Sequence, residues 1–210
     1  MNKLIGAIVC VTVCICLASC GGGGGSKSSL PKIGKVDIQM LSNEAELKKI
    51  YGVIEEKAGE HIKRMDEILL TVSSPSIERG RQNREDDFTM MIYYLYPKNK
   101  NKLYQVNYNS EGGWSENVCD IELARGVDAE SFVLEEAMFD LSAFSADKLC
   151  RIVKDALAKH KDEKKYAVQY IKEIQIKDDE VSITIYSRLA SNDVEQKQHY
   201  EADFDGDEIQ

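Results

Sequence analysis

The segments Phe88-Thr-Met-Met-Ile-Tyr93 and Val181-Ser-Ile-Thr-Ile-Tyr186 share one alternation of apolar and polar residues. Further along each copy, Tyr104-Gln-Val-Asn-Tyr-Asn-Ser110 resembles Tyr200-Glu-Ala-Asp-Phe-Asp-Gly206 in residue type at every position. The offset is 93 residues in the first pair and 96 in the second, and the polar loop between the strands absorbs the difference. A period of two is typical of half-buried strands. The chain therefore predicts two equivalent β-hairpins.

A helix is predicted before each hairpin. Over residues 44–64, and again over 145–161, apolar residues recur at steps of three and four, which gives each helix one buried face. Ser42 or Asn43 is the expected N-cap of the first helix, and Ser145 is that of the second.

One further strand is expected between each helix and its hairpin, at 68–77 and at 166–176, although Pro75 disfavours a strand in the first stretch. Residues 114–123 and the terminal Glu208-Ile209 would each add an edge strand. The predicted fold class is α+β, with two repeats of one helix followed by three or four antiparallel strands and the helices packed on the sheet. Whether the repeats form one sheet or two stays open.

The N-terminus has the layout of a secretory leader. Lys3 supplies a basic start, an apolar run extends from Leu4 to Leu17, and small residues follow. This run is shorter than the roughly 20 residues that a spanning helix needs. Five glycines and a short Ser/Lys stretch come next, which is the composition of a flexible tether.

Leu17-Ala-Ser-Cys20 resembles a bacterial lipoprotein signal. The resemblance implies that Cys20 becomes the first residue of the mature chain and carries palmitate-type acyl groups; the alternative is a plain secretory signal cut near Ala18. Gly21, in place of Asp, implies the outer membrane, and the lack of an acidic run after it favours the periplasmic side. The membrane is then a partner through the lipid anchor at Cys20.

Together with the linking stretch 139–149, these features resemble Bacteroidetes envelope lipoproteins of unassigned function. The helix-hairpin unit is similar to PepSY-like and beta-lactamase-inhibitor-protein-like folds, whose tandem repeats build one antiparallel surface. No functional residue carries over, because such families share a surface and no catalytic constellation. The predicted segments are 1–19 (lipoprotein signal peptide), 20–35 (lipid-anchored Gly/Ser tether), 36–125 (first repeat) and 126–210 (second repeat).

The net charge and the cysteine content argue against some classes of function. The chain has 27 basic and 36 acidic residues and a net charge of −9, which argues against nucleic-acid binding. Cys119 and Cys150 are the two cysteines beyond the lipid site, and they are expected as buried thiols or as a disulfide. Neither has a second Cys or a His at ligand spacing, so no metal is expected there.

Three groups of residues contain side chains of the kinds that occur in catalytic or metal-binding sites. Ser145-Ala-Asp-Lys148 has the Ser-x-x-Lys spacing of penicillin-binding enzymes, but the companion motifs are missing, so an N-cap is the simpler interpretation. The run 203–208 holds four carboxylates without the spacing of a calcium loop. The histidines are far apart in sequence, at His61, His160 and His199. No cofactor and no metal site are predicted.

Aromatic residues crowd the first hairpin, and the candidate binding surface comprises Tyr94, Tyr96, Tyr104, Tyr108 and Trp114. Exposed Tyr and Trp favour binding, whereas the alternative is ordinary cross-strand pairing. The predicted function is a membrane-anchored, non-catalytic envelope protein that presents a β-sheet surface to another envelope protein or a ligand. The alternatives are a carrier of small molecules or lipids, with an apolar cavity between helix and sheet, and a hydrolase of envelope polymers.

Overall fold

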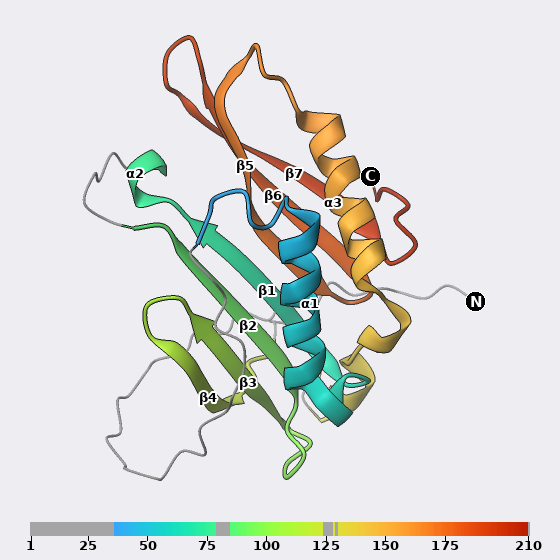
Figure 1. Cartoon of the computed structure of the whole chain (residues 1–210). Coiled ribbons are helices and arrows are strands. Elements are labelled where there is room, and N and C mark those ends of the chain that lie inside the picture. The colour runs from blue at the N-terminus through green and yellow to red at the C-terminus, as the bar shows by residue number, and fades with distance from the viewer. Residues whose placement is uncertain (1–35, 79–84, 124–127, 129, 210) are drawn as a thin grey trace.

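The computed structural model describes residues 36–78, 85–123, 128 and 130–209 (Figure 1). The predicted leader, Cys20 and the tether lie outside the described residues. Two helices, α1 (Glu44–Ala58) and α3 (Ala146–His160), lie on one face of an antiparallel seven-stranded sheet (Figure 1), so the predicted α+β class is confirmed. The strands are β1 (Met65–Ser73), β2 (Asp87–Leu95), β3 (Lys102–Asn109), β4 (Gly113–Asp120), β5 (Tyr166–Lys177), β6 (Glu180–Leu189) and β7 (Glu195–Asp203).

The strand order is β4-β3-β2-β1-β5-β6-β7, which places β1 and β5 side by side at the centre. Four residue pairs join them, from Ile68↔Ile176 to Thr71↔Glu173. The two predicted regions therefore share one sheet, a point that the sequence left open. The edges are β4 and β7, and Glu208 forms an isolated bridge with Ala202 of β7.

Both long helices begin at the expected caps. Asn43 Oδ1 accepts hydrogen bonds from the backbone N–H groups of Ala45 and Glu46, at 3.0 and 3.2 Å. Helix α1 ends at Ala58, earlier than residue 64, because Gly59 takes a φ of +52°, which terminates a helix at little cost for glycine. A short 3₁₀ turn, η1 (Gly59–His61), follows it.

The strand expected over 68–77 ends sooner than predicted. Strand β1 stops at Ser73, and Pro75 opens the short helix α2 (Pro75–Glu78). Proline suits the first position of a helix, because it lacks an N–H and has a fixed φ, and it cannot donate to a sheet. Two further 3₁₀ turns, η2 (Leu134–Ala137) and η3 (Leu141–Ala143), lie in the connection from β4 to α3.

The core is divided by the sheet. The larger cluster fills the space between the sheet and the two helices, and it includes Tyr94. The smaller cluster contains Tyr93 and Leu95, together with Leu103, Cys119 and Leu134. Since neighbouring residues of a strand point to opposite faces, the smaller cluster lies on the face opposite α1 and α3, where Leu134 packs against residues of β2 and β3.

Candidate interaction surface

The five predicted aromatic residues, here called the aromatic patch, differ in exposure. Tyr94 and Tyr108 are buried, with exposed fractions of 7% and 6%. Tyr96, Tyr104 and Trp114 are half-buried. Contact area for a partner is therefore offered by three of the five rings, while Tyr94 and Tyr108 lie beside Tyr104 and Trp114 as buried neighbours.

A row of aromatic rings in contact begins at His61, in the η1 turn that follows α1. His61 stacks on Tyr94 at 4.7 Å between centroids, and Tyr94 lies opposite Tyr104 in the sheet with the rings 5.4 Å apart. Tyr96 stacks on Tyr104 at 5.7 Å and an interplanar angle of 11°. Of these contacts, Tyr94–Tyr104 is a cross-strand pair, and together the contacts fix the ring orientations.

Trp114 occupies the start of edge strand β4. It lies opposite Tyr108, with the rings 4.9 Å apart. The Lys57 ammonium, from the last turn of α1, lies 4.3 Å from the centroid of the Trp114 ring and 4.0 Å from Oε1 of Glu116. Helix α1 thus holds the indole through a cation–π contact at the border of the aromatic patch.

The hydroxyls of Tyr94 and Tyr104 stay protonated near neutral pH. The hydroxyl of Tyr104 donates to Oε2 of Glu116 at 2.7 Å, and this hydrogen bond, together with burial, raises the Tyr104 pKa. Burial, with a smaller contribution from Glu116, raises the pKa of Tyr94 to about 12. Neither phenol can act as a base near neutral pH, so the aromatic patch offers contact area and hydrogen-bond donors.

Exposure of the aromatic patch follows from the layout of the layers. Figure 1 shows α1 in front of the central strands, with β3 and β4 beyond its edge. Most of β4 is exposed, and Val118 retains 44% of its surface. Sequence reasoning missed Lys57, Glu116 and Val118. Residues 114–123 were expected as an edge strand, but no local signal shows how far a helix extends over a sheet.

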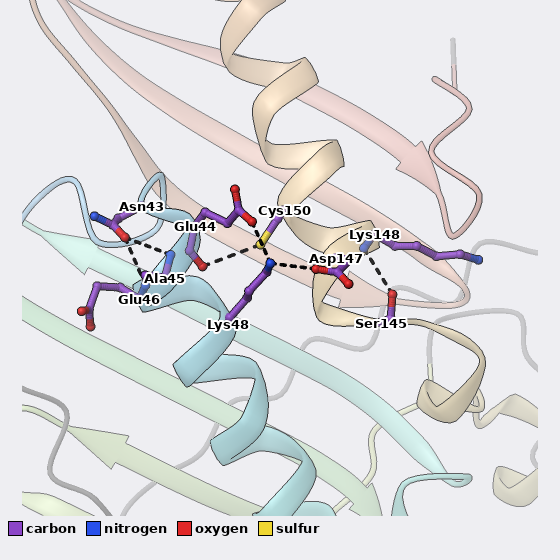
Figure 2. Close-up of polar contacts among 9 residues, drawn as sticks. All are labelled: Asn43, Glu44, Ala45, Glu46, Lys48, Ser145, Asp147, Lys148 and Cys150. Carbon is purple, nitrogen blue, oxygen red and sulfur yellow. Dashed lines mark hydrogen bonds and ion pairs between the residues drawn. The ribbon is translucent and has the colours of Figure 1, made fainter.

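The Ser145–Lys148 pair is not assembled as a catalytic dyad. Oγ of Ser145 accepts a hydrogen bond from the backbone N–H of Lys148 at 3.3 Å, as an N-cap does. Figure 2 shows the Lys148 side chain pointing away from Ser145, and its ammonium lies 3.1 Å from Asp205. A lysine must reach the serine hydroxyl to activate it, and this one is held elsewhere.

The same region joins the two helices. The ammonium of Lys48 lies 2.7 Å from Glu44 on its own helix and 2.8 Å from Asp147 on α3 (Figure 2). The thiol of Cys150 approaches the Glu44 carbonyl at 3.9 Å. The thiol of Cys119 lies in the smaller cluster, 3.7 Å from Oε1 of Gln105. The two sulfur atoms therefore sit on opposite faces of the sheet, and both are free thiols, that of Cys119 buried and that of Cys150 half-buried.

The carboxylates at 203–208 lie in a turn, which one of them stabilises by hydrogen bonds. Oδ1 of Asp203 accepts from the backbone N–H groups of Asp205 and Asp207, both at 2.9 Å, and Gly206 takes a φ of +87°. Of the histidines, His61 stacks on Tyr94, His199 lies 3.3 Å from the Thr184 hydroxyl, and His160 ends α3. Within the described ranges, no three His, Cys, Asp or Glu residues are grouped to hold a metal ion.

A small pocket opens near the β5–β6 turn. Its volume is about 150 Å³, and it is lined by Gln175, Lys177, Asp178, Glu180, Val181, Ser182 and Glu201. Sites for small molecules are usually larger, about 300–1,000 Å³, and mostly apolar. This pocket therefore does not have the character of the cavity expected of a lipid carrier. No helix in the described part of the chain is long and apolar enough to cross a membrane.

No family model, curated protein or solved structure matches the chain.

Proposed function

We propose that the protein is a lipid-anchored, non-catalytic envelope protein that binds another envelope protein through the aromatic patch. The observation that carries the proposal is the half-exposed row Tyr96, Tyr104 and Trp114 beside α1. Rings held in fixed orientations lose little entropy on binding, and Tyr and Trp are enriched at the energetic centres of interfaces.

The polar groups around these rings fit the same role. Glu116 and Lys57 lie at the border of the aromatic patch, the first bonded to the Tyr104 hydroxyl and the second above Trp114. An apolar centre with a charged border is the usual anatomy of a protein interface. The alternative of a hydrolase lacks support from Ser145, whose lysine neighbour is bound to Asp205.

The leader supports the location. The motif Leu17–Cys20, followed by a glycine-rich tether, supports acylation of Cys20 and attachment to the outer membrane facing the periplasm. Several acyl chains on one residue give stable anchoring, whereas a single chain binds only marginally. A domain on a flexible tether would search the nearby membrane surface for its partner.

We also propose that the chain is a tandem duplication of one helix-plus-sheet unit. Support comes from the order of elements, since α1 precedes β1–β4 and α3 precedes β5–β7. Outward from the central β1–β5 pair, β2 corresponds to β6 and β3 to β7. The matching segments 88–93 and 181–186 fall in β2 and β6. Strand β4 has no full counterpart among the described strands of the second unit, and all five residues of the aromatic patch lie in the first unit.

The test is site-specific photo-cross-linking in the native envelope. A photoreactive amino acid replaces Tyr96 in the full chain, and a matched chain carries it at Val194, which is 48% exposed in the β6–β7 turn. We expect a discrete cross-linked product from position 96, absent from position 194 and lost when Trp114→Ala is added. Equal products from both positions, or a product unchanged by Trp114→Ala, would refute the proposal.

A further inference from the structure

The two edge strands of the sheet, β7 and β4, differ in how far the described chain covers them. At the β7 edge the chain returns on itself: Glu208 bridges to Ala202, and the backbone N–H of Ile209 donates to the Glu201 carbonyl at 3.0 Å. Strand β4 forms the other edge, and no described strand lies beyond it. Five of its eight residues, Ser115, Glu116, Asn117, Val118 and Asp120, are exposed. A long edge of this kind is a template for strand addition unless something blocks it.

Charge usually blocks such an edge, but here each acidic residue is already paired within the chain. Glu116 accepts from the Tyr104 hydroxyl and lies 4.0 Å from Lys57. Asp120 lies 2.7 Å from Lys102 of β3. The edge therefore presents little uncompensated charge. Val118, one of the most exposed large apolar residues of the described chain, lies between these two acids on the same face.

We propose that β4 pairs with β4 of a second copy of this chain, giving an antiparallel dimer with one continuous sheet. Two antiparallel copies of the same strand are related by a two-fold axis perpendicular to the sheet, so the helices of both copies lie on the same side. Residues that lie opposite each other in the dimer must then have side chains on the same face of the sheet. The register between the two β4 strands can therefore shift only by an even number of residues.

One register stands out among these. With Asn117 opposite Asn117, Glu116 lies opposite Val118 of the other copy, and Trp114 lies opposite its Asp120. A shift by two residues places Glu116 opposite either Glu116 or Asp120. Like charges directly opposite each other destabilise a strand pair, so the Asn117-centred register is the one that this sequence favours. It also brings the two aromatic patches side by side on one face.

The dimer is formed through the backbone edge of β4, whereas the proposed function uses the faces of the aromatic rings. Trp114, which lies on β4 and faces Asp120 of the other copy in this register, belongs to both surfaces. Anchoring would assist it, because confinement of both copies to one membrane raises their effective concentration. The dimer would nevertheless exist or fail whatever the aromatic patch binds.

The test uses Asn117→Cys in the full chain, expressed in a bacterial envelope and treated with copper–phenanthroline. Directly opposite residues of an antiparallel pair have Cα atoms about 4.5–5.5 Å apart, which a disulfide can span. We expect a covalent dimer on a non-reducing gel. The matched control is Val194→Cys, at an exposure of 48%, and the parent chain reports any contribution of the native cysteines.

A second pair of variants tests the register. In the Asn117→Cys chain, Val118→Lys would face Glu116 of the other copy, whereas Val118→Glu would place like charges opposite each other. Because each contact occurs twice in the dimer, we expect the association constant of the Lys variant to exceed that of the Glu variant by roughly two- to thirtyfold or more. Circular dichroism confirms that both variants fold.

Cross-linking of Asn117→Cys no faster than of Val194→Cys would overturn the dimer. Equal cross-linking of the Lys and Glu variants would overturn the register. Either failure is distinguishable from failure of the proposed function, which is read from a product at position 96 that Trp114→Ala leaves unchanged.

Discussion

Replacement of Glu78 by glutamine should be among the most destabilising single changes of a charged residue in this protein. Its carboxylate, whose side chain is 8% exposed, accepts hydrogen bonds from the Tyr170 hydroxyl at 2.6 Å and from the Ser74 backbone N–H at 3.0 Å. The third donor is the Lys172 ammonium, on a side chain with 21% exposure. Removing one partner of a buried pair costs about 3–5 kcal/mol, because the other charge stays buried.

The lower part of that range applies here. Lys172 retains some contact with water, and glutamine still offers an oxygen to Tyr170, so we expect a loss of about 3 kcal/mol in the free energy of unfolding at pH 7. The contact matters for the sheet because α2 follows β1, whereas Tyr170 and Lys172 belong to β5. It supplements the four residue pairs that join β1 to β5.

The assay is urea unfolding followed by the fluorescence of Trp114, the single tryptophan, and by circular dichroism. The matched control is Glu46→Gln, which breaks an exposed ion pair with Lys49 at 2.6 Å and side-chain exposures of 39% and 70%. Such pairs contribute about 0–1 kcal/mol. A loss for Glu78→Gln that equals the loss for Glu46→Gln would refute the reasoning.

The pH dependence gives an independent check on the same residue. Burial raises the pKa of the Glu78 carboxyl, but the hydrogen bonds from Lys172, Tyr170 and Ser74 outweigh burial and hold it below its ordinary value of 4.5. The folded protein therefore binds this proton more weakly than the unfolded chain. The stability that Glu78 supplies is present above pH 4.5 and is lost as the pH falls through the lower folded pKa. Glu78→Gln should remove this part of the acid sensitivity.

Three further outcomes are expected. Burial, together with Glu67 and Asp178, raises the pKa of Asp66 to about 6. The free energy of unfolding should therefore fall as the pH rises from about 4 to about 6. In thermal melts, Asp66→Asn should remove this pH dependence and stabilise the protein at pH 7 by up to about 3 kcal/mol. Cys20→Ala should abolish acyl labelling and move the protein to the soluble periplasmic fraction, and unchanged membrane association would contradict the anchor. Ser145→Ala should cost about 1 kcal/mol in urea unfolding through loss of the N-cap, while Ser145→Asp should restore it.

Much of the fold was predictable because its signals are local. Alternation of apolar and polar residues identified the hairpins at 88–108 and 181–204, and a stripe at steps of three and four identified both helices. Ser145 was expected as a cap, and its side chain takes that role. Each of these features depends on residues within one turn or one strand pair of one another.

The contacts that join distant segments could not be predicted in this way. Glu78 and Lys172 lie 94 residues apart, and no pattern in the sequence around either residue predicts their contact. The pairing of β1 with β5 likewise joins segments that lie far apart in the sequence. The burial of Tyr94 also depends on tertiary structure, since alternation assigns it a face but does not show that His61 covers it.

The corresponding tyrosines of the two hairpins show where the halves have diverged. Tyr104 and Tyr200 begin matching segments, yet Tyr104 is half-buried whereas Tyr200 is only 6% exposed. The difference has a structural cause. Beside Tyr200, the ammonium of Lys159 lies 5.7 Å from the ring centroid and also pairs with Glu208, so the C-terminal segment is tied to α3 next to the ring.

Beside Tyr104 there is no such return of the described chain, and the edge strand β4 extends the sheet instead. If the two units descend from one, as proposed, the second has closed its edge and its tyrosine, whereas the first has kept both available. Selection for stability alone would favour closing both edges, because an open edge exposes a protein to unwanted strand addition. An open edge and half-exposed rings in the same unit are therefore better explained by a partner that binds there.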